Sequence, residues 1–224
     1  FGSIHAFLTE KRTNIIRGSV KTIVTWFHIE PNDTKVARLV REQNSVARIH
    51  TACSMTKNQL ISAGVAPEKI IQIPLGIDLT VFEPKTDTSS AQLRKQLGIP
   101  ADAFVIGSFQ KDGIGWGEGD EPKLIKGPDI FIKVVSELSK RNKIHILLTG
   151  PGRGYIKKGL SEAGVSFTYI PYIEDGSAVA PYYHALDMYL VSSRIEGGPM
   201  AILESWASGV PIVATRVGMI PDIA

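Results

Sequence analysis

This chain of 224 residues contains one cysteine, Cys53, and no apolar run near the roughly 20 residues that a helix needs to cross a bilayer. A single cysteine excludes an internal disulfide and favours a reducing compartment, so we expect a cytoplasmic protein in which Cys53 is a small buried side chain. No set of histidine, cysteine or carboxylate side chains has metal-ligand spacing, so we expect no bound metal. No internal repeat or low-complexity segment is found either.

The two ends of the chain look cut. It begins at Phe1 without a methionine and stops at Ala224, shortly after 220–222. We therefore expect a fragment of a longer protein, from which any N-terminal targeting segment is missing. A hydrophobic content of 43% is typical of globular proteins, and the length suits one large domain or two small ones.

Positive charge is concentrated near the start. Residues 1–48 hold eight lysines and arginines against four acids. Such a segment is compatible with peripheral contact with anionic lipid headgroups, each basic residue contributing about 1 kcal/mol, but a solvated helix face is the favoured interpretation. Stacking aromatics do not alternate with these basic residues, so we expect no nucleic-acid partner.

Short strands alternate with helices along the whole chain, which predicts an α/β fold with parallel sheets. In the first part the predicted strands are 21–28, 45–51 and 70–73, and the predicted helices are 33–43 and 54–63, with Ser54 as the cap. This part ends near Pro84, so we predict two domains, 1–84 and 85–224.

In the second part, residues 86–90 are expected to be a linker leading into a short helix through Leu97. Five strands follow, at 104–109, 144–149, 166–170, 187–191 and 211–214. A long helix is predicted to start at Pro128, with four apolar residues at i, i+3, i+4 and i+7 on one buried face: Phe131, Val134, Val135 and Leu138.

Two glutamates eight positions apart, Glu196 and Glu204, flank a predicted helix start. Gly197 and Gly198 have no side chain to block a close ligand, and Pro199 suits the first helical position, where free N–H groups attract phosphate. Glu204 would lie more than one turn inside the helix, where a carboxylate needs a polar ligand or a cleft. The less specific interpretation places Glu204 at the edge of an amphipathic stripe and Glu196 in a solvated turn.

Several segments of this chain resemble the retaining glycosyltransferases of family four, the group 1 glycosyltransferases. They are 193–204, 73–78 with 82–84, 126–129 and 213–218. The resemblance implies the GT-B architecture, with two Rossmann-like domains facing across a cleft: an acceptor-side domain, incomplete here, and a nucleotide-sugar-binding domain. It also implies catalysis without a metal or other cofactor.

Two lysines are candidates for the donor diphosphate. Lys126 precedes a helix start, whose dipole favours phosphate, and the resemblance implies that it contacts the diphosphate. The arginine usual in the family at the preceding strand end is absent from 108–112, where Lys111 is the candidate substitute. The glycine-rich segment 112–120 carries three acids and is expected to be a mobile loop at the cleft rim.

The resemblance assigns sugar hydroxyls to Glu196 and ribose hydroxyls to Glu204. We therefore predict catalytic roles for Glu196, Lys126 and Lys111, and donor binding by Glu204, Gly197, Gly198, Pro199, Met200 and Gly150. Gly150 opens the turn 150–155, which is only weakly similar to a dinucleotide fingerprint because its last position is Tyr155. His28 follows a strand and is a candidate contact for the sugar or acceptor, or a solvent-facing histidine.

These assignments predict transfer of a sugar, a hexose, from a nucleotide-sugar donor to a hydroxyl acceptor on a sugar, lipid or glycan, with retained anomeric configuration. Preorganised cations and amides would stabilise the negative charge that develops on the leaving diphosphate. The alternatives are a nucleotide-sugar epimerase or phosphorylase of the same architecture, and a nucleotide-sugar-binding module without catalysis.

Overall fold

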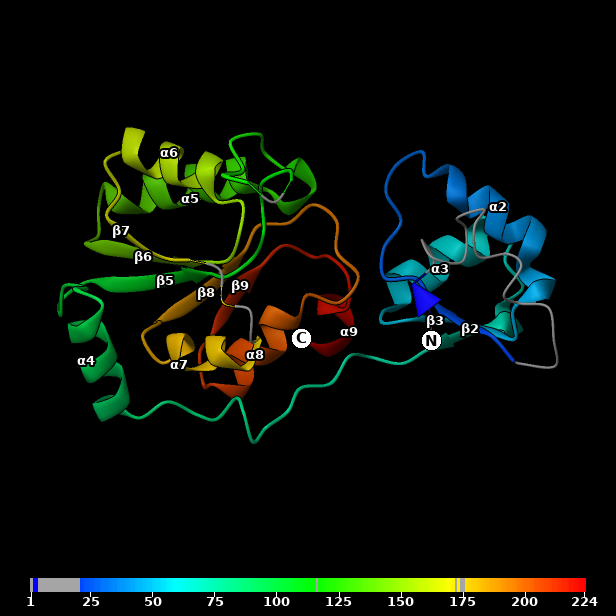
Figure 1. The fold of residues 1–224 in the computed structure, drawn as a ribbon, viewed down its shortest axis with the longest axis horizontal. Coiled ribbons are helices and arrows are strands. Elements are labelled where there is room, and N and C mark those ends of the chain that lie inside the picture. The colour runs from blue at the N-terminus through cyan, green and yellow to red at the C-terminus, as the bar shows by residue number, and fades with distance from the viewer. Residues whose placement is uncertain (1, 4–20, 116, 172, 174–175) are drawn as a thin grey trace. The chain divides into compact units, whose positions relative to one another are not determined.

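The computed structural model describes residues 2–3, 21–115, 117–171, 173 and 176–224 (Figure 1). Contacts divide the chain into two compact units. The first unit comprises Phe1–Leu75, Ile195–Pro199 and Arg216–Ala224, and the second comprises Gly76–Arg194 and Met200–Thr215. Each unit is built on one parallel sheet, so the predicted α/β fold with two Rossmann-like sheets is confirmed. The domain boundary between residues 84 and 85 stays a prediction.

The first unit has a four-stranded sheet in the order β1-β2-β3-β4. Its strands are β1 (Gly2–Ser3), β2 (Ile23–Thr25), β3 (Arg48–Thr51) and β4 (Ile70–Gln72). Its helices are α2 (Thr34–Glu42), α3 (Ser54–Ser62) and α9 (Ile220–Ile223), with the 3-10 turns η2 (Gln43–Ser45) and η3 (Pro67–Lys69). Val24 pairs with Ile49 and Ile49 with Ile70, so these side chains enter one core with Trp26 and Leu39.

The second unit has a five-stranded sheet in the order β7-β6-β5-β8-β9, and all its pairs are parallel. The strands are β5 (Phe104–Ser108), β6 (Ile144–Thr149), β7 (Phe167–Ile170), β8 (Met188–Val191) and β9 (Ile212–Ala214). The helices are α4 (Asp87–Gln96), α5 (Pro128–Ser139), α6 (Gly154–Glu162), α7 (Ala180–Tyr183) and α8 (Met200–Ala207), with the 3-10 turns η4 (Leu124–Lys126) and η5 (Gly176–Val179). Within this unit, α5 and α6 cover one face of the sheet and α7 and α8 the other (Figure 1).

Helix α5 begins at Pro128, as predicted, and packs its apolar residues on β5 and β6. Phe131 and Val135 are fully buried with Ile106 and Ile146. Val134 and Leu138, predicted on the same buried face, are exposed instead. Residues 131 and 135 point at the sheet, so position 134 falls on the flank of the helix, whereas Leu138 shares the buried face but lies in the last turn of α5, which ends at Ser139.

Two expected helix starts differ in detail. Residues 86–90 are the first turn of α4 rather than a linker, because Thr86 and Ser89 form a reciprocal capping box. Helix α3 is capped by Cys53 rather than Ser54, since the Thr56 N–H points at Cys53 Sγ at 3.4 Å. Cys53 is fully buried, as expected for a small apolar side chain.

Among the residues that the structure describes, every helix is too short or too polar to cross a bilayer. Three members of the basic front segment, Lys11, Arg12 and Arg17, lie outside the described residues. The expected contact of this segment with a membrane surface therefore stays a prediction.

Candidate functional site

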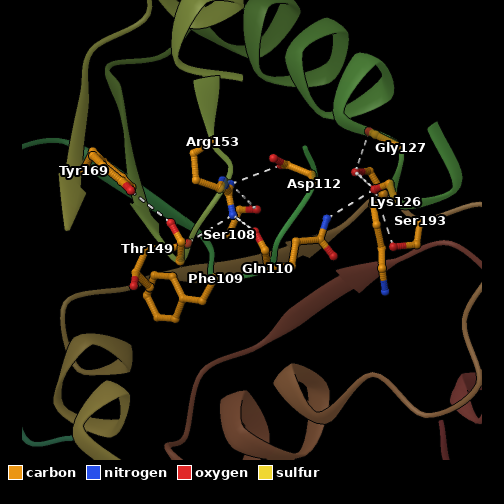
Figure 2. A network of polar contacts seen from close by, with 12 residues as sticks. Ser108, Phe109, Gln110, Asp112, Lys126, Gly127, Thr149, Arg153, Tyr169 and Ser193 are labelled. Carbon is orange, nitrogen blue, oxygen red and sulfur yellow. Dashed lines mark hydrogen bonds and ion pairs between the residues drawn. The ribbon is translucent and has the colours of Figure 1, made fainter. Parts of the chain in front are cut away.

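Polar residues gather where β5, β6 and β8 end, at the carboxyl edge of the sheet in the second unit (Figure 2). Ligands of open parallel α/β sheets bind at this edge, because the turns that leave the strands meet there. Three of the predicted site residues lie at this edge: Lys111 follows β5, Gly150 follows β6, and Lys126 ends η4.

The backbone of Lys126 is held from two sides. Its carbonyl accepts a hydrogen bond from Gln110 Nε2 at 3.2 Å and one from Ser193 Oγ at 3.5 Å. The next carbonyl, of Gly127, accepts from Ser192 Oγ at 2.8 Å. Gly127 adopts the left-handed conformation (φ 63°, ψ 39°) and is the residue from which α5 starts. Lys126 is thus placed at the helix start by residues that follow β5 and β8.

The guanidinium of Arg153 lies among the residues at this edge and joins the ends of β5 and β6 (Figure 2). Its Nη1 donates to the carbonyls of Gln110 and of Thr149, the latter at 3.2 Å. Its Nη2 donates to Ser108 Oγ at 3.0 Å and lies 3.4 Å from Asp112 Oδ2. Only 1% of Arg153 is exposed. Arg153 is not among the predicted site residues, although a basic residue inside a glycine-rich turn after a strand is a usable signal for such a role.

Asp112 is the counterion of Arg153 and is completely buried. Neither of its carboxylate oxygens has a hydrogen-bond partner among the described residues. Burial raises the pKa of Asp112 from 3.8 to about 6, and the positive charge of Arg153 offsets only part of that rise. The charged form of Asp112 is therefore held at a cost to the folded state.

Replacing Asp112 with asparagine should remove one source of the pH dependence of stability. The folded protein keeps the Asp112 proton up to about pH 6, whereas the unfolded chain releases it near 3.8. The contribution of Asp112 to the free energy of unfolding is therefore fully present below pH 3.8 and is lost as the pH rises through 6. Relative to Asp112→Asn, wild type should lose about 3 kcal/mol of unfolding free energy between pH 3.5 and 7. Urea unfolding of both proteins over this range measures the difference, and parallel curves would contradict the expectation.

The glycine-rich segment 112–120 is attached to α6 rather than being an open loop. Gly113 pairs with Pro122, and the carbonyls of Glu118 and Gly119 accept from the first N–H groups of α6, those of Gly154 and Tyr155. Trp116 lies outside the described residues. Helix starts need acceptors for their N–H groups. This segment supplies them, so these two N–H groups of α6 are already bonded within the protein.

Gly150 belongs to the turn between β6 and α6, and Lys111 lies against the same turn. Gly150 has φ 101°, and its carbonyl accepts from the Tyr169 hydroxyl at 3.0 Å. The stem of Lys111 crosses Gly152, because a Cβ added to Gly152 would lie 3.6 Å from Cγ and Cε of Lys111. Lys111 is thereby placed on the same turn that carries Arg153.

Glu204 lies within α8, as predicted, and is half-buried. Its Oε2 accepts a hydrogen bond of 2.6 Å from the hydroxyl of Tyr183, whose ring is fully buried against Phe109. Burial raises the pKa of Glu204, while the Tyr183 hydrogen bond lowers it. Tyr183 therefore fixes one carboxylate oxygen of Glu204.

Helix α8 begins at Met200, one residue later than predicted, with Pro199 immediately before it. Such a one-residue difference is ordinary at helix ends. Glu196 is only 8% exposed, which rules out the solvated turn considered for it. The space beside Gly197 is filled by the carbonyl of Phe27, 1.9 Å from where a Cβ would stand. This glycine is therefore required by close chain packing.

Gly198 and His28 are two further predicted site residues, and both lie in the first unit. Gly198 also lies in tight packing, since an added Cβ would stand 2.6 Å from Leu75 Cδ1. His28 is half-buried with its Nε2 3.6 Å from Glu30 Oε1. The first unit holds His28, Glu196, Gly197, Gly198 and Pro199, and the second holds Lys111, Lys126, Gly150, Met200 and Glu204. The structure brings Lys126 and Lys111 to one sheet edge, and their roles stay predictions.

The known proteins to which this chain is similar in sequence are glycosyltransferases. Residues 119–224 match the family model described as Glycosyl transferases group 1. The D-inositol 3-phosphate glycosyltransferase of Corynebacterium aurimucosum is 25% identical over 206 residues, covering 84% of this chain and 46% of that protein. The enzyme of the same name from Arthrobacter sp. is 31% identical over 157 residues, covering 65% of this chain and 33% of that protein. The chain thus spans about half the length of these relatives or less.

Solved structures show the same fold. The Anabaena protein HepE in complex with UDP-glucose matches with a TM-score of 0.75 and 19% identity, covering 91% of this chain and 56% of that one. Sucrose-phosphate synthase from Thermosynechococcus elongatus matches with a TM-score of 0.73 and 17% identity, covering 93% and 53%. At this level of identity the likeness establishes the architecture of the chain.

Proposed function

We propose that this chain, whose residues 119–224 match the family model of the group 1 glycosyltransferases, transfers a hexose from a nucleotide-sugar donor to a hydroxyl acceptor with retained configuration. The observation that carries the proposal is the placement of Lys126. Gln110 and Ser193 hold its backbone where α5 starts, at the carboxyl edge of a parallel sheet. A cation at a helix start there suits the diphosphate of an activated sugar.

The chemistry follows from where charge develops. As the bond between the sugar and the diphosphate breaks, the leaving diphosphate gains negative charge. The ammonium groups of Lys126 and Lys111 and the positive end of the α5 dipole stabilise that charge. Because these groups are positioned before the reaction, they do not have to reorganise in the transition state, which is the source of the rate enhancement.

The carboxylates orient the donor. Tyr183 occupies Oε2 of Glu204, so Oε1 is the oxygen that accepts from the ribose hydroxyls. Glu196 holds sugar hydroxyls and His28 contacts the sugar or the acceptor. These groups act by orientation rather than by acid-base catalysis. The solved relative bound to UDP-glucose supports a uridine diphosphate sugar as the first donor to test, and the curated relatives' name supports a hydroxyl of a phosphorylated polyol as the first acceptor.

A donor panel tests the function. Uridine, guanosine and adenosine diphosphate sugars are screened by thermal shift, and the donor that binds is incubated with candidate acceptors. A glycosylated product whose anomeric proton coupling matches the donor supports retaining transfer. An altered sugar without acceptor indicates an epimerase, and dependence on inorganic phosphate indicates a phosphorylase. Donor binding without product indicates a binding module.

Replacing Glu204 with glutamine should weaken donor binding about 10- to 100-fold, because a hydrogen bond from a hydroxyl to a charged oxygen contributes about 1.5 to 3 kcal/mol. Isothermal titration calorimetry with the selected donor measures the loss. Glu162→Gln is the matched control, since Glu162 is an exposed residue at the end of α6 whose nearest cation, Lys158, is 3.9 Å away. Unchanged affinity in Glu204→Gln would refute the ribose assignment.

A further inference from the structure

We propose that Arg153 is a positioning residue for the donor diphosphate: its buried guanidinium holds Gln110 and thereby places Lys126 and Lys111. This inference rests on the proposed function, because it assigns a role to a residue that acts through the two lysines.

The first step is the binding of Arg153 to residues at the ends of two neighbouring strands, β5 and β6. Its acceptors are the carbonyls of Gln110 and Thr149 and the hydroxyl of Ser108 (Figure 2). They follow or end β5 and β6, which pair from Phe104 and Ile144 to Ser108 and Leu148. A planar guanidinium offers its donors in a rigid fork and can satisfy several such acceptors at once, whereas the ammonium of a lysine is a compact point charge.

The second step runs through Gln110. Its carbonyl accepts from Arg153, and its side-chain amide donates to the Lys126 carbonyl at 3.2 Å (Figure 2). One residue thus connects the buried guanidinium to the backbone of the predicted phosphate-binding lysine. Any change in the position of the Gln110 backbone is passed to its side chain and so to Lys126.

The third step concerns Lys111. It follows Gln110 directly, and its stem lies across Gly152, the residue before Arg153. Gly152 has φ 64°, which only glycine adopts without strain, so the turn can pass closely under the lysine. Arg153 therefore anchors both the segment that carries Lys111 and the turn on which Lys111 rests.

Burial distinguishes this role from direct catalysis. The side chain of Arg153 is fully covered and paired with Asp112, which is fully covered as well. The guanidinium does not reach a ligand at the surface of the site. Its effect on the reaction must pass through Gln110, Lys111 and Lys126, whose positions it sets.

The test compares two changes at Arg153 with a matched control. Arg153→Lys keeps the charge and removes the fork. The double variant Arg153→Met with Asp112→Asn removes both buried charges, so it leaves no unpaired carboxylate if the single variant fails to fold. Arg94→Lys is the control, because Arg94 also binds a carbonyl, of Ala185 at 2.9 Å, and a carboxylate, of Asp187 at 2.8 Å, just before β8 starts. Circular dichroism establishes that each variant is folded.

Calorimetry with uridine, guanosine and adenosine diphosphate selects the probe, and the matching nucleoside is titrated beside it. Arg153→Lys and the double variant should bind the diphosphate about tenfold more weakly and the nucleoside unchanged, while Arg94→Lys binds both as wild type does. Lys126→Ala should cost less in the Arg153→Lys background than in wild type, because the two residues act in series.

Unchanged diphosphate affinity in the folded Arg153 variants would overturn the inference, as would equal losses for diphosphate and nucleoside or strictly additive losses with Lys126→Ala. These results leave the proposed function intact as long as wild type binds a nucleoside diphosphate. If wild type binds none of the three, the proposed function is wrong and the role of Arg153 falls with it.

Discussion

Replacing Lys126 with alanine should lower kcat about 100- to 1,000-fold, the effect of removing one preorganised donor from a developing negative charge. The protein should stay folded, because the contacts of Lys126 with Gln110 and Ser193 use its backbone carbonyl, which alanine keeps. We therefore expect the unfolding temperature to change by only a few degrees. Steady-state kinetics and thermal unfolding of the same preparation measure the two effects.

Lys143→Ala is the control for a lysine in the same unit. Lys143 directly precedes β6, and its ammonium lies 2.6 Å from Asp102 at an exposed position. Exposed pairs of this kind contribute about 0 to 1 kcal/mol, so both activity and stability should stay near wild type. Parallel losses of activity and unfolding temperature in Lys126→Ala would instead indicate a structural lysine.

Replacing Gly127 with alanine should remove most of the activity and destabilise the fold by about 3 kcal/mol. Gly127 has φ 63°, and an added Cβ would stand 2.0 Å from the carbonyl oxygen of Ser192. The left-handed conformation alone costs a non-glycine residue about 1 to 2 kcal/mol, and the clash with a backbone atom forces a shift that costs about 1 to 3 more. That shift moves Lys126, the preceding residue, away from its place at the start of α5.

Gly164→Ala separates the strain from the clash. Gly164 has nearly the same φ, 66°, and an added Cβ meets nothing within 4 Å. This variant should lose only the conformational part, about 1 to 2 kcal/mol in urea unfolding, and keep full activity. If the two glycine variants are equally stable and active, the close approach of Gly127 to Ser192 is not what constrains the site.

Local chemistry made much of the fold predictable. The strands 104–109 and 144–149 are predicted because most of their residues are apolar, and β5 and β6 match them closely. Pro128 marked the start of α5 because its missing N–H and fixed φ suit the first helical position. Such signals depend on a few neighbouring residues, so they can be read without tertiary contacts. The exposure of Val134 and Leu138 could not be predicted from the sequence, because it depends on how the helix lies on the sheet.

In the candidate site, too, residues with a local sequence signal were predicted, and contacts between distant segments were not. Lys126 was predicted from its position before a helix start, and Glu204 from a carboxylate amid apolar residues. The hydrogen bond from Tyr183 to Glu204 was not predicted, because the two residues are 21 positions apart in the chain. The glycine-rich segment 112–120 was expected to be a mobile loop at the cleft rim, whereas its Glu118 and Gly119 carbonyls accept hydrogen bonds from the first N–H groups of α6. Pairings between distant segments are chosen by the packing of whole elements, which a linear pattern does not encode directly.

By itself, the sequence determined the alternation of strands and helices, the starts of the main helices and the residue types available for binding an activated sugar. Only the tertiary structure decided that Arg153 reaches Ser108 and Gln110, more than 40 positions earlier in the chain. The reason is the strand order β6-β5-β8, which places three turns side by side at one sheet edge. A buried guanidinium has to find several acceptors, and that strand order is what brings the acceptors of Arg153 together.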